Sequence, residues 1–260
     1  MASGPEANAE RAGALVVGAS GGLGTAMARE LARQGYRVAL VGRRQDALDA
    51  LCRELNASAG GSGAGEPVAR TYAHDVRDYD AAPALFARIA ADVAPLRMVV
   101  YAAGVMPRIK TGTSFADERD IIEVNVTGAL RWLSLAADHF EAQGTGTIIG
   151  LSSVAGDRGR PGNGAYQASK AALSSYLDSL RFRLAPRGVR VVTAKPGYVW
   201  TEMTAGLPLA KPLTIMPDRA ARGVLRAAAR GKSVAYVPGY WRAIMWLVRR
   251  MPASMVARLP

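Results

Sequence analysis

The stretch ALVVGASGGLG, residues 14–24, decides how the chain is expected to fold. Its apolar first half predicts a buried strand, glycines follow at positions 18, 22 and 24, and a helical pattern begins directly after them. Glycines at a strand-to-helix turn let the backbone bend tightly and approach a pyrophosphate that rests on the helix N-terminus. A close-packed corner without a ligand is the alternative. We therefore expect a dinucleotide site that includes Gly18, Ser20, Gly22, Leu23 and Gly24.

Apolar runs and helical patterns alternate along the chain from this point. Such strict alternation is typical of a parallel sheet that is covered on both faces. We predict an α/β fold, a Rossmann-like doubly wound parallel sheet in three layers, as a single domain over residues 13–238. Residues 1–12 are expected to form a flexible tail, and the Gly/Ser-rich residues 57–67 a flexible surface connection. The expected strands are residues 14–18, 36–42, 67–73, 98–104 and 147–153, and the expected helices are residues 23–34, 45–55, 79–94, 115–143 and 167–184.

Length and composition limit the protein class. The 260 residues, half of them hydrophobic, are enough for one large domain with a buried core. Cys52 is the only cysteine and the chain has two histidines, so we expect neither an intrachain disulfide nor a metal site. The apolar residues 14–17 are too few for the core of a signal peptide, and we expect a cytoplasmic protein.

A second stretch, LSSVAGDRGRPGNGAYQASK at residues 151–170, carries candidate catalytic residues. Tyr166 and Lys170 stand four apart at the start of a predicted helix, so both project from one face. The ammonium is expected to lower the pKa of the phenol from about 10 and make Tyr166 a general acid or base. Ser153, at a strand end, could hydrogen bond the oxygen that Tyr166 protonates. A solvated helix pair is the alternative for Tyr166 and Lys170 alone.

Ser153, Tyr166 and Lys170, with the glycine spacing of residues 18–24, resemble the short-chain dehydrogenase/reductase (SDR) family. The resemblance implies an NAD(P)-dependent oxidoreductase that reduces a ketone to a secondary alcohol, with Tyr166 as the general acid. It makes Asn125 a fourth catalytic residue, which interrupts a helix and completes a proton path through the cofactor ribose, Lys170 and a water. A merely buried polar residue is the alternative for Asn125.

The resemblance also implies cofactor contacts in the middle of the chain. Asp75, with Val76 beside it, matches the aspartate that holds the adenine amino group, and a plain turn aspartate is the alternative. Ala102 and Gly104 match residues that keep the cofactor wall open. Tyr101 replaces the first asparagine of the family's usual N-N-A-G, and what replaces its amide is open.

The stretch KPGYVWTEM, residues 195–203, ends a predicted strand and matches a further motif of the family. The P-G-x-V-x-T pattern implies contacts with the nicotinamide amide and the phosphates. The Pro/Leu-rich residues 202–214 are expected to form a substrate lid. The residues of the motif are Pro196, Gly197, Val199 and Thr201.

The second predicted strand ends in Arg43 and Arg44 and lacks the carboxylate that usually accepts hydrogen bonds from the ribose of NAD. Arg43 offers a planar donor fork suited to a 2′-phosphate, with Arg44 as a second cation. A solvent-facing arginine pair is the alternative. The sequence therefore favours NADP(H) over NAD(H).

The formal charge of +12 is concentrated near the C-terminus, where residues 219–260 hold nine Lys or Arg and no Asp or Glu. This asymmetry suggests an anionic partner, either a membrane surface or nucleic acid. Within residues 239–260 an apolar stripe predicts a basic amphipathic helix that cannot span a bilayer. Packing of this helix on the protein itself or on a partner subunit, and contact with the inner face of the cell membrane, are both open. The stripe consists of Trp241, Ile244, Met245, Val248 and Met251.

The C-terminal 110 residues have a narrower resemblance, carried by AGDRGRPGNGAYQASK, MTAGLPLAKPLT and VPGYWRAIMWLVRRMPASMVARLP. They are similar to reductases that act on a decaprenyl-phosphate-linked 2-keto-pentose, the second half of a 2′-epimerase. A lipid-linked keto-sugar is therefore a candidate substrate, beside other small ketones.

A non-catalytic NADPH-binding protein with a regulatory or nucleic-acid-binding role is the rival interpretation, since positive charge does not distinguish phosphate polymers. The complete set of Ser153, Tyr166, Lys170 and Asn125 argues against it. The resemblance also implies a homodimer or tetramer that pairs the helices carrying Asn125 and Tyr166.

Overall fold

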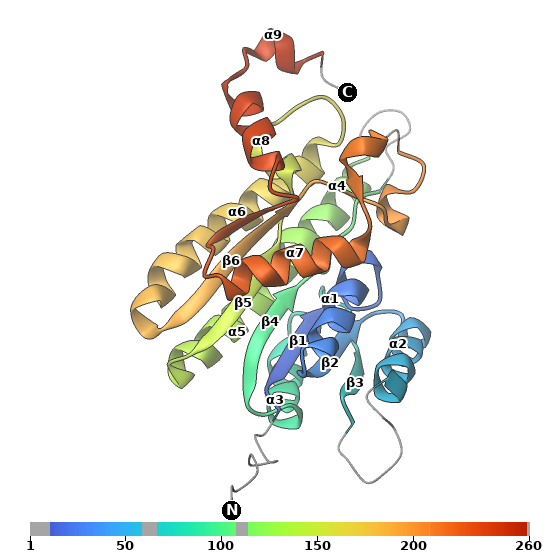
Figure 1. Ribbon diagram of the computed structural model, residues 1–260, viewed down its shortest axis with the longest axis vertical. Coiled ribbons are helices and arrows are strands. Elements are labelled where there is room, and N and C mark those ends of the chain that lie inside the picture. Colours follow the sequence, from blue (N-terminus) through green and yellow to red (C-terminus); the bar gives the residue numbers. More distant parts are fainter. Residues whose placement is uncertain (1–10, 59–66, 108–113, 208, 259–260) are drawn as a thin grey trace, which may run out of the picture.

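The computed structural model describes residues 11–58, 67–107, 114–207 and 209–258 (Figure 1). Seven parallel strands form one sheet in the order β3-β2-β1-β4-β5-β6-β9. This confirms the predicted Rossmann-like fold, whereas the predicted tail and the connection at residues 57–67 lie largely outside the described residues. The strands are β1 (Gly13–Val17), β2 (Arg37–Gly42), β3 (Ala69–Ala73), β4 (Leu96–Tyr101), β5 (Gly146–Leu151), β6 (Val189–Pro196) and β9 (Val234–Val237).

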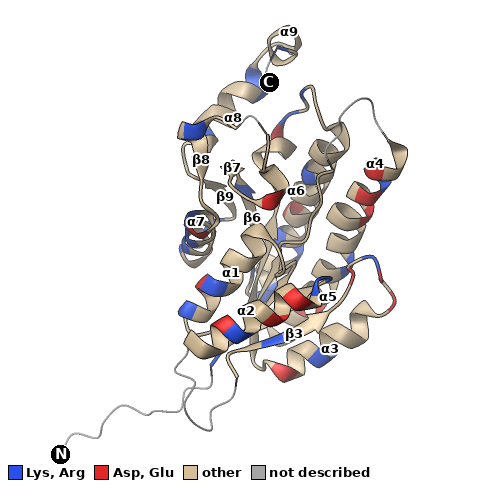
Figure 2. Ribbon diagram, turned by 90° about the vertical axis from the view of Figure 1, so that its right-hand side faces the viewer, with Lys and Arg blue, Asp and Glu red and all other residues tan. Residues whose placement is uncertain are grey.

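Helices cover both faces of the sheet and give the predicted three layers (Figure 2). Every residue of β1 and β5 is buried, which is why these strands are almost continuously apolar. One face is covered by α1 (Gly22–Arg33), α2 (Gln45–Ser58) and α7 (Pro217–Ala229). The other is covered by α3 (Ala82–Asp92), α5 (Gly128–Gln143), which follows α4 (Phe115–Ile122), and α6 (Gly164–Leu184).

The strand order reverses between β1 and β4, which pair in parallel at the middle of the sheet. In open α/β sheets, ligands bind in the crevice outside the carboxyl ends of the strands at such a point. The register aligns Val17 with Tyr101, Tyr101 with Gly150, and Leu151 with Ala194. All the segments that carry predicted site residues therefore begin at the same edge of the sheet.

A small second sheet anchors the predicted lid. Strand β7 (Tyr198–Val199) pairs in parallel with β8 (Thr214–Ile215), so both ends of the intervening segment are held together. Two short 3₁₀ turns, η4 (Glu202–Thr204) and η5 (Lys211–Leu213), lie between these strands.

The C-terminal residues do not form the single helix that the sequence predicted. Helix α8 (Trp241–Arg250) ends where Met251 becomes extended, and a short α9 (Ala253–Val256) follows Pro252. Proline lacks the N–H that would continue the helix and disfavours a helical residue before it. We call residues 239–258 the C-terminal arm, which projects beyond the sheet in Figure 1.

The two faces of α8 have different surroundings. Its inner residues Trp241 and Met245 are buried against Val154, which supports the interpretation that this face packs on the protein itself. Its outer residues Trp246 and Leu247 are 53% and 58% exposed. Among the described residues, no helix is both long and apolar enough to cross a membrane.

Candidate active site

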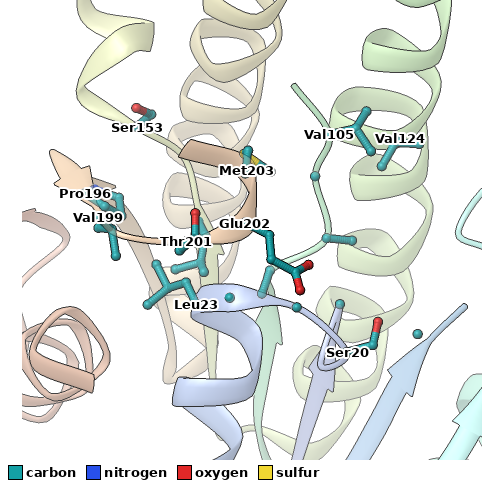
Figure 3. A pocket seen from close by; sticks show the side chains of 18 of the residues that line it. Ser20, Leu23, Val105, Val124, Ser153, Pro196, Val199, Thr201, Glu202 and Met203 are labelled. Atoms are coloured by element: carbon teal, nitrogen blue, oxygen red, sulfur yellow. The ribbon is translucent and has the colours of Figure 1, made fainter. Parts of the chain in front are cut away.

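A cavity of about 450 Å³ opens at the carboxyl edge of the sheet (Figure 3). This volume is in the range of sites for small molecules and cofactors. The structure places Gly24, Asp75 and Asn125 outside the cavity wall and brings the other predicted site residues together on it. Those that line it are Gly18, Ser20, Gly22, Leu23, Arg43, Val76, Ala102, Gly104, Ser153, Tyr166, Lys170, Pro196, Gly197, Val199 and Thr201.

The glycine-rich turn is shaped to bring backbone close to a ligand. Gly18 has a φ of +92°, and a Cβ there would lie 2.4 Å from the backbone nitrogen of Ala103. A Cβ on Gly24 would lie 2.0 Å from the carbonyl oxygen of Gly18, so this glycine lets α1 pack against the turn. Helix α1 begins without a side-chain cap and without an acidic residue in its first turn. Its first N–H groups are therefore suited to a phosphate.

Near the end of β2, Arg43 lines the cavity with a half-exposed side chain. Asp75 does not line it; Arg77 binds the Asp75 carboxylate at 2.7 Å and donates its backbone N–H to the same group. Arg77 also holds the pKa of Asp75 below its usual value. The adenine contact of Asp75 stays a prediction, and His74 and Val76 line the wall here.

Sequence reasoning missed a contact that crosses the cleft. Arg44 donates to the carbonyl oxygen of Ser20 and lies 3.3 Å from Glu202, which points toward the glycine-rich turn in Figure 3. Thr201 and Thr204 cap η4 reciprocally, a pattern visible in the sequence as two threonines three apart. The contact of Arg44 with Glu202 therefore connects the predicted lid to the glycine-rich turn.

Ser153 and Tyr166 reach the cavity from two neighbouring elements. Ser153 follows β5 and begins the turn η2 (Val154–Asp157), where its hydroxyl accepts from the N–H of Ala155 at 3.0 Å. Asn163 caps α6 by accepting from the backbone N–H of Tyr166 at 3.0 Å. Both side chains line the cavity, and the Ser153 hydroxyl acts to lower the pKa of the Tyr166 phenol. The predicted pair is therefore brought together.

The titration of Tyr166 and Lys170 is dominated by burial. Burial raises the pKa of Tyr166 to about 12, and the Ser153 hydroxyl opposes this shift. Lys170 Nζ lies 5.6 Å from the centroid of the Tyr166 ring and donates to the carbonyl oxygen of Leu151 at 2.9 Å. Burial lowers the pKa of Lys170 to about 8. The net shift on the Tyr166 pKa is opposite to the predicted lowering, because in the protein alone desolvation outweighs the effect of the Ser153 hydroxyl.

Asn125 lies in a π-helical turn, η1 (Glu123–Thr127), between α4 and α5, as the predicted interruption of that helix requires. Its fully buried amide accepts from the N–H of Val105 at 2.8 Å and donates to the Ser169 hydroxyl at 3.1 Å. A Cβ on Gly104 would lie 3.3 Å from Asn125 Oδ1 and 3.5 Å from Lys170 Nζ. Gly104 thus keeps open the space between these two groups, and the proton path through them stays a prediction.

Tyr101 supplies a hydrogen bond to this π turn. The side chain is fully buried, and its hydroxyl donates to the carbonyl oxygen of Val124 at 2.6 Å. A Cβ on Gly128 would lie 3.0 Å from that hydroxyl, so the glycine leaves room for the phenol. In a π turn the backbone carbonyls lose their usual helical partners. Tyr101 therefore holds the turn at the position where the family's asparagine stands.

Comparisons with known proteins identify the class. The family model of short-chain dehydrogenases matches residues 12–211. An uncharacterized oxidoreductase of Mycobacterium tuberculosis is 34% identical over 251 residues, which cover 94% of this chain and 95% of the relative. The cis-4-hydroxycyclohexanecarboxylate dehydrogenase of Sinomonas cyclohexanicum is 34% identical over 232 residues and 88% of each chain. The structure of an actinorhodin polyketide ketoreductase with NADPH has a TM-score of 0.78 at 24% identity, over 91% of this chain and 99% of that one.

The chain therefore belongs to the short-chain dehydrogenase/reductase family, and it is an oxidoreductase of that class. This favours the enzymatic interpretation over the non-catalytic scaffold.

Replacing Tyr101 tests its structural role. Tyr101→Phe removes the donor to Val124, and we expect the free energy of unfolding to fall by about 1–3 kcal/mol because a buried acceptor loses its partner. Urea denaturation measures this change. The control is Tyr79→Phe, whose hydroxyl donates to Glu123 of the same turn at 3.4 Å from a less buried position and should matter less. Unchanged stability of Tyr101→Phe would contradict the assignment.

Proposed function

We propose that the protein uses NADPH to reduce a ketone to a secondary alcohol. The observation that carries this proposal is that Ser153, Tyr166 and Lys170 lie together on the cavity wall, with the buried Lys170 ammonium 5.6 Å from the centroid of the Tyr166 ring. The glycine-rich turn at the start of α1 supports dinucleotide binding, because its N–H groups are free of a side-chain cap. When bound, the cofactor supplies the hydride that reduces the carbonyl carbon.

The residues on the cavity wall bind the substrate carbonyl and transfer the proton. The Ser153 hydroxyl donates to the carbonyl oxygen of the substrate and keeps it within reach of Tyr166. The Tyr166 phenol, held protonated by burial, gives its proton to that oxygen as negative charge develops there. The Lys170 ammonium stabilises the phenolate that remains, and Asn125 is proposed to complete the route by which the proton is replaced. This path is supported by the space that Gly104 leaves between Asn125 and Lys170.

The preference for NADP(H) rests on Arg43. Its guanidinium lines the cavity, and the Asp75 carboxylate, 3.9 Å away, is itself bound by Arg77. Arg43 can therefore turn its donor fork to a 2′-phosphate. Arg44 is already committed to Ser20 and Glu202, so we assign it the secondary role.

The substrate is proposed as a class only. The name of one relative indicates a cyclic hydroxy acid, and that of one structural neighbour a polyketide, so the family accommodates varied carbonyl and alcohol groups. The lipid-linked keto-sugar of the narrower resemblance, and the homodimer or tetramer, stay predictions.

We further propose that the C-terminal arm contacts an anionic membrane surface. The inner face of α8 is used in packing, yet Trp246 and Leu247 remain exposed on its outer face. The Arg250 guanidinium stacks over the Trp246 ring at 4.1 Å. The C-terminal arm carries four arginines and no Asp or Glu, and its charged ribbon segments in Figure 2 are all basic. Exposed aromatic and basic residues on one short helix are typical of proteins that bind at the membrane interface.

Tyr166→Phe tests the general acid. We expect kcat for ketone reduction to fall by about 10²–10⁴-fold, the usual contribution of a positioned acid. The affinity for NADPH should stay within about twofold, because the phenol oxygen is a minor part of that large site. The control is Tyr176→Phe on the same helix, outside the cavity wall. Stopped-flow measurement of NADPH oxidation gives kcat for each variant, and an active Tyr166→Phe enzyme would refute the proposal.

Arg43→Ala tests the cofactor preference. Loss of a charge-assisted contact with the 2′-phosphate should weaken NADPH binding by about 10- to 100-fold and leave NADH binding almost unchanged. Isothermal titration with both nucleotides measures this ratio. Arg44→Ala is the matched control and should change the ratio less. If Arg44→Ala has the larger effect, the two arginines have been assigned in the wrong order.

The membrane proposal is tested by replacing both Trp246 and Leu247 with alanine. Binding to vesicles of phosphatidylglycerol should fall by at least about tenfold, because two exposed apolar side chains no longer enter the interface. Binding of the wild type should weaken as salt rises. The control is Phe182→Ala, a 78% exposed aromatic on α6. Equal sedimentation of the double variant and the wild type with vesicles would exclude the arm as an anchor.

A further inference from the structure

Trp241, the first residue of α8, lies directly behind the cavity wall. Its side chain is 4% exposed, and a Cβ on Gly197 would lie 1.8 Å from its indole Nε1. Gly197 lines the cavity and has no positive φ that would by itself require glycine. The indole therefore occupies the space that any side chain at position 197 would need, and the backbone of Gly197 rests on it.

The same indole supports the turn that carries Ser153. Trp241 packs against Val154, the residue after Ser153, and meets the Tyr198 ring edge-on at 5.1 Å. With Met245, these side chains form a buried cluster separate from the two cores on the faces of the sheet. Trp241 thus fills the space between the serine turn and the end of β6.

A polar clamp holds the two segments on which Trp241 rests. The Asp157 carboxylate, at the end of the serine turn, has only 1% of its side chain exposed. It pairs with Lys195 Nζ at 2.5 Å and accepts from the Tyr236 hydroxyl at 2.7 Å. Lys195 directly precedes Pro196 and Gly197 in β6. The clamp therefore fixes the ends of these segments, and Trp241 sets how closely their site residues approach.

The residue before Trp241 extends this support to the predicted lid. The Tyr240 hydroxyl donates to the carbonyl oxygen of Leu213 at 3.2 Å, and Leu213 packs against the Trp241 cluster. Leu213 ends η5, in the segment whose other end, Glu202 to Thr204, lines the cavity. Three cavity-forming segments are thus supported by the start of α8.

We propose that Trp241 is a positioning residue for hydride transfer. It does not line the cavity; it acts through Gly197 and Val154 to fix the nicotinamide end of the cleft relative to Ser153. This inference rests on the proposed reduction and adds to it that the C-terminal arm is part of the catalytic scaffold. Positioning matters here because a displacement of about 1 Å at the reacting atoms can reduce a rate by about 100-fold.

The shape of the indole carries this role, whereas its N–H group does not. Trp241 Nε1 is buried and has no hydrogen-bond partner among the residues that the structure describes. Phenylalanine keeps an aromatic plate under Gly197 and removes the unpaired N–H, whereas alanine leaves a cavity between the two segments. The two substitutions therefore separate support by volume from any polar function.

The experiment compares the wild type with Trp241→Phe, Trp241→Ala and Met245→Ala. Met245→Ala is the matched control, because it removes a buried side chain of the same cluster that is not beneath Gly197. We expect Trp241→Ala to lower kcat by about 10- to 100-fold, while the Kd of NADPH changes less than about twofold, since the phosphates bind elsewhere. Trp241→Phe should retain kcat within about threefold by the same argument.

A second measurement does not depend on turnover. The fluorescence of bound NADPH reports the surroundings of its dihydronicotinamide ring, and in Trp241→Ala it should move toward that of the free nucleotide at unchanged Kd. If the wild type binds NADPH but reduces no ketone of a broad panel, the proposed reaction fails and this fluorescence still tests the position of the ring. A wild type that binds no NADPH refutes both proposals.

Three results would overturn the inference alone. One is a folded Trp241→Ala enzyme with the kcat and NADPH fluorescence of the wild type. Another is an equal loss of kcat in Trp241→Ala and Met245→Ala, which would indicate general loosening of the cluster. The third is a Trp241→Phe enzyme as impaired as Trp241→Ala while its thermal unfolding matches the wild type, which would show that the indole volume is not the cause.

Discussion

The hydrogen bond from Lys170 Nζ to the carbonyl oxygen of Leu151 is the contact on which the site depends. It joins the first turns of α6 to the end of β5, and so brings the helix that carries Tyr166 to the strand that leads into Ser153. The ammonium loses hydration when it is buried here, which only a close acceptor can offset. Ser152 strengthens the same junction, because its hydroxyl donates to the carbonyl oxygen of Lys170 at 2.9 Å. A parallel sheet makes this arrangement available, since its carboxyl ends meet at one edge.

The π turn at Glu123–Thr127 shows how an irregular element is stabilised for function. Extra backbone in a helix turns Asn125 toward the interior, where its amide joins the loop at Val105 to α6 through Ser169. The turn disturbs the regular helical bonding of its carbonyls. Tyr101, at the end of β4, compensates by donating a hydrogen bond from its hydroxyl to the carbonyl oxygen of Val124. The substitution that departs from the family motif thus has a physical role: a phenol reaches a carbonyl where the family carries an amide.

The sequence predicted the parts of the site that depend on local spacing. Tyr166 and Lys170 four apart on a helix, and glycines at a strand-to-helix turn, constrain geometry without knowledge of the rest of the fold. Contacts between distant segments could not be predicted from local spacing. Examples are the ion pair of Glu202 with Arg44 and the hydrogen bond of the Tyr101 hydroxyl to the π turn. The ion pair of Asp75 with Arg77, two residues away, was also not predicted, and the adenine contact of Asp75 stays a prediction. Pro252 indicates a break in the C-terminal helix, because proline interrupts helical hydrogen bonding. The apolar stripe continues to Met251, and it was therefore interpreted as one longer helix.

Burial affects the two titrating groups of the site with opposite consequences for stability. Lys170 has its pKa lowered from 10.5 to about 8, so the penalty for its burial is present in full below about pH 8 and fades as the pH rises toward 10.5. Tyr166 has its pKa raised from 10.0 to about 12, so the penalty for its ionisation appears only above about pH 10. At neutral pH the phenol is therefore protonated without a penalty, whereas the ammonium carries one. A site held in this state suits the proposed donation of a proton to a developing alkoxide, because the phenolate that would remain is the group that relieves the buried cation.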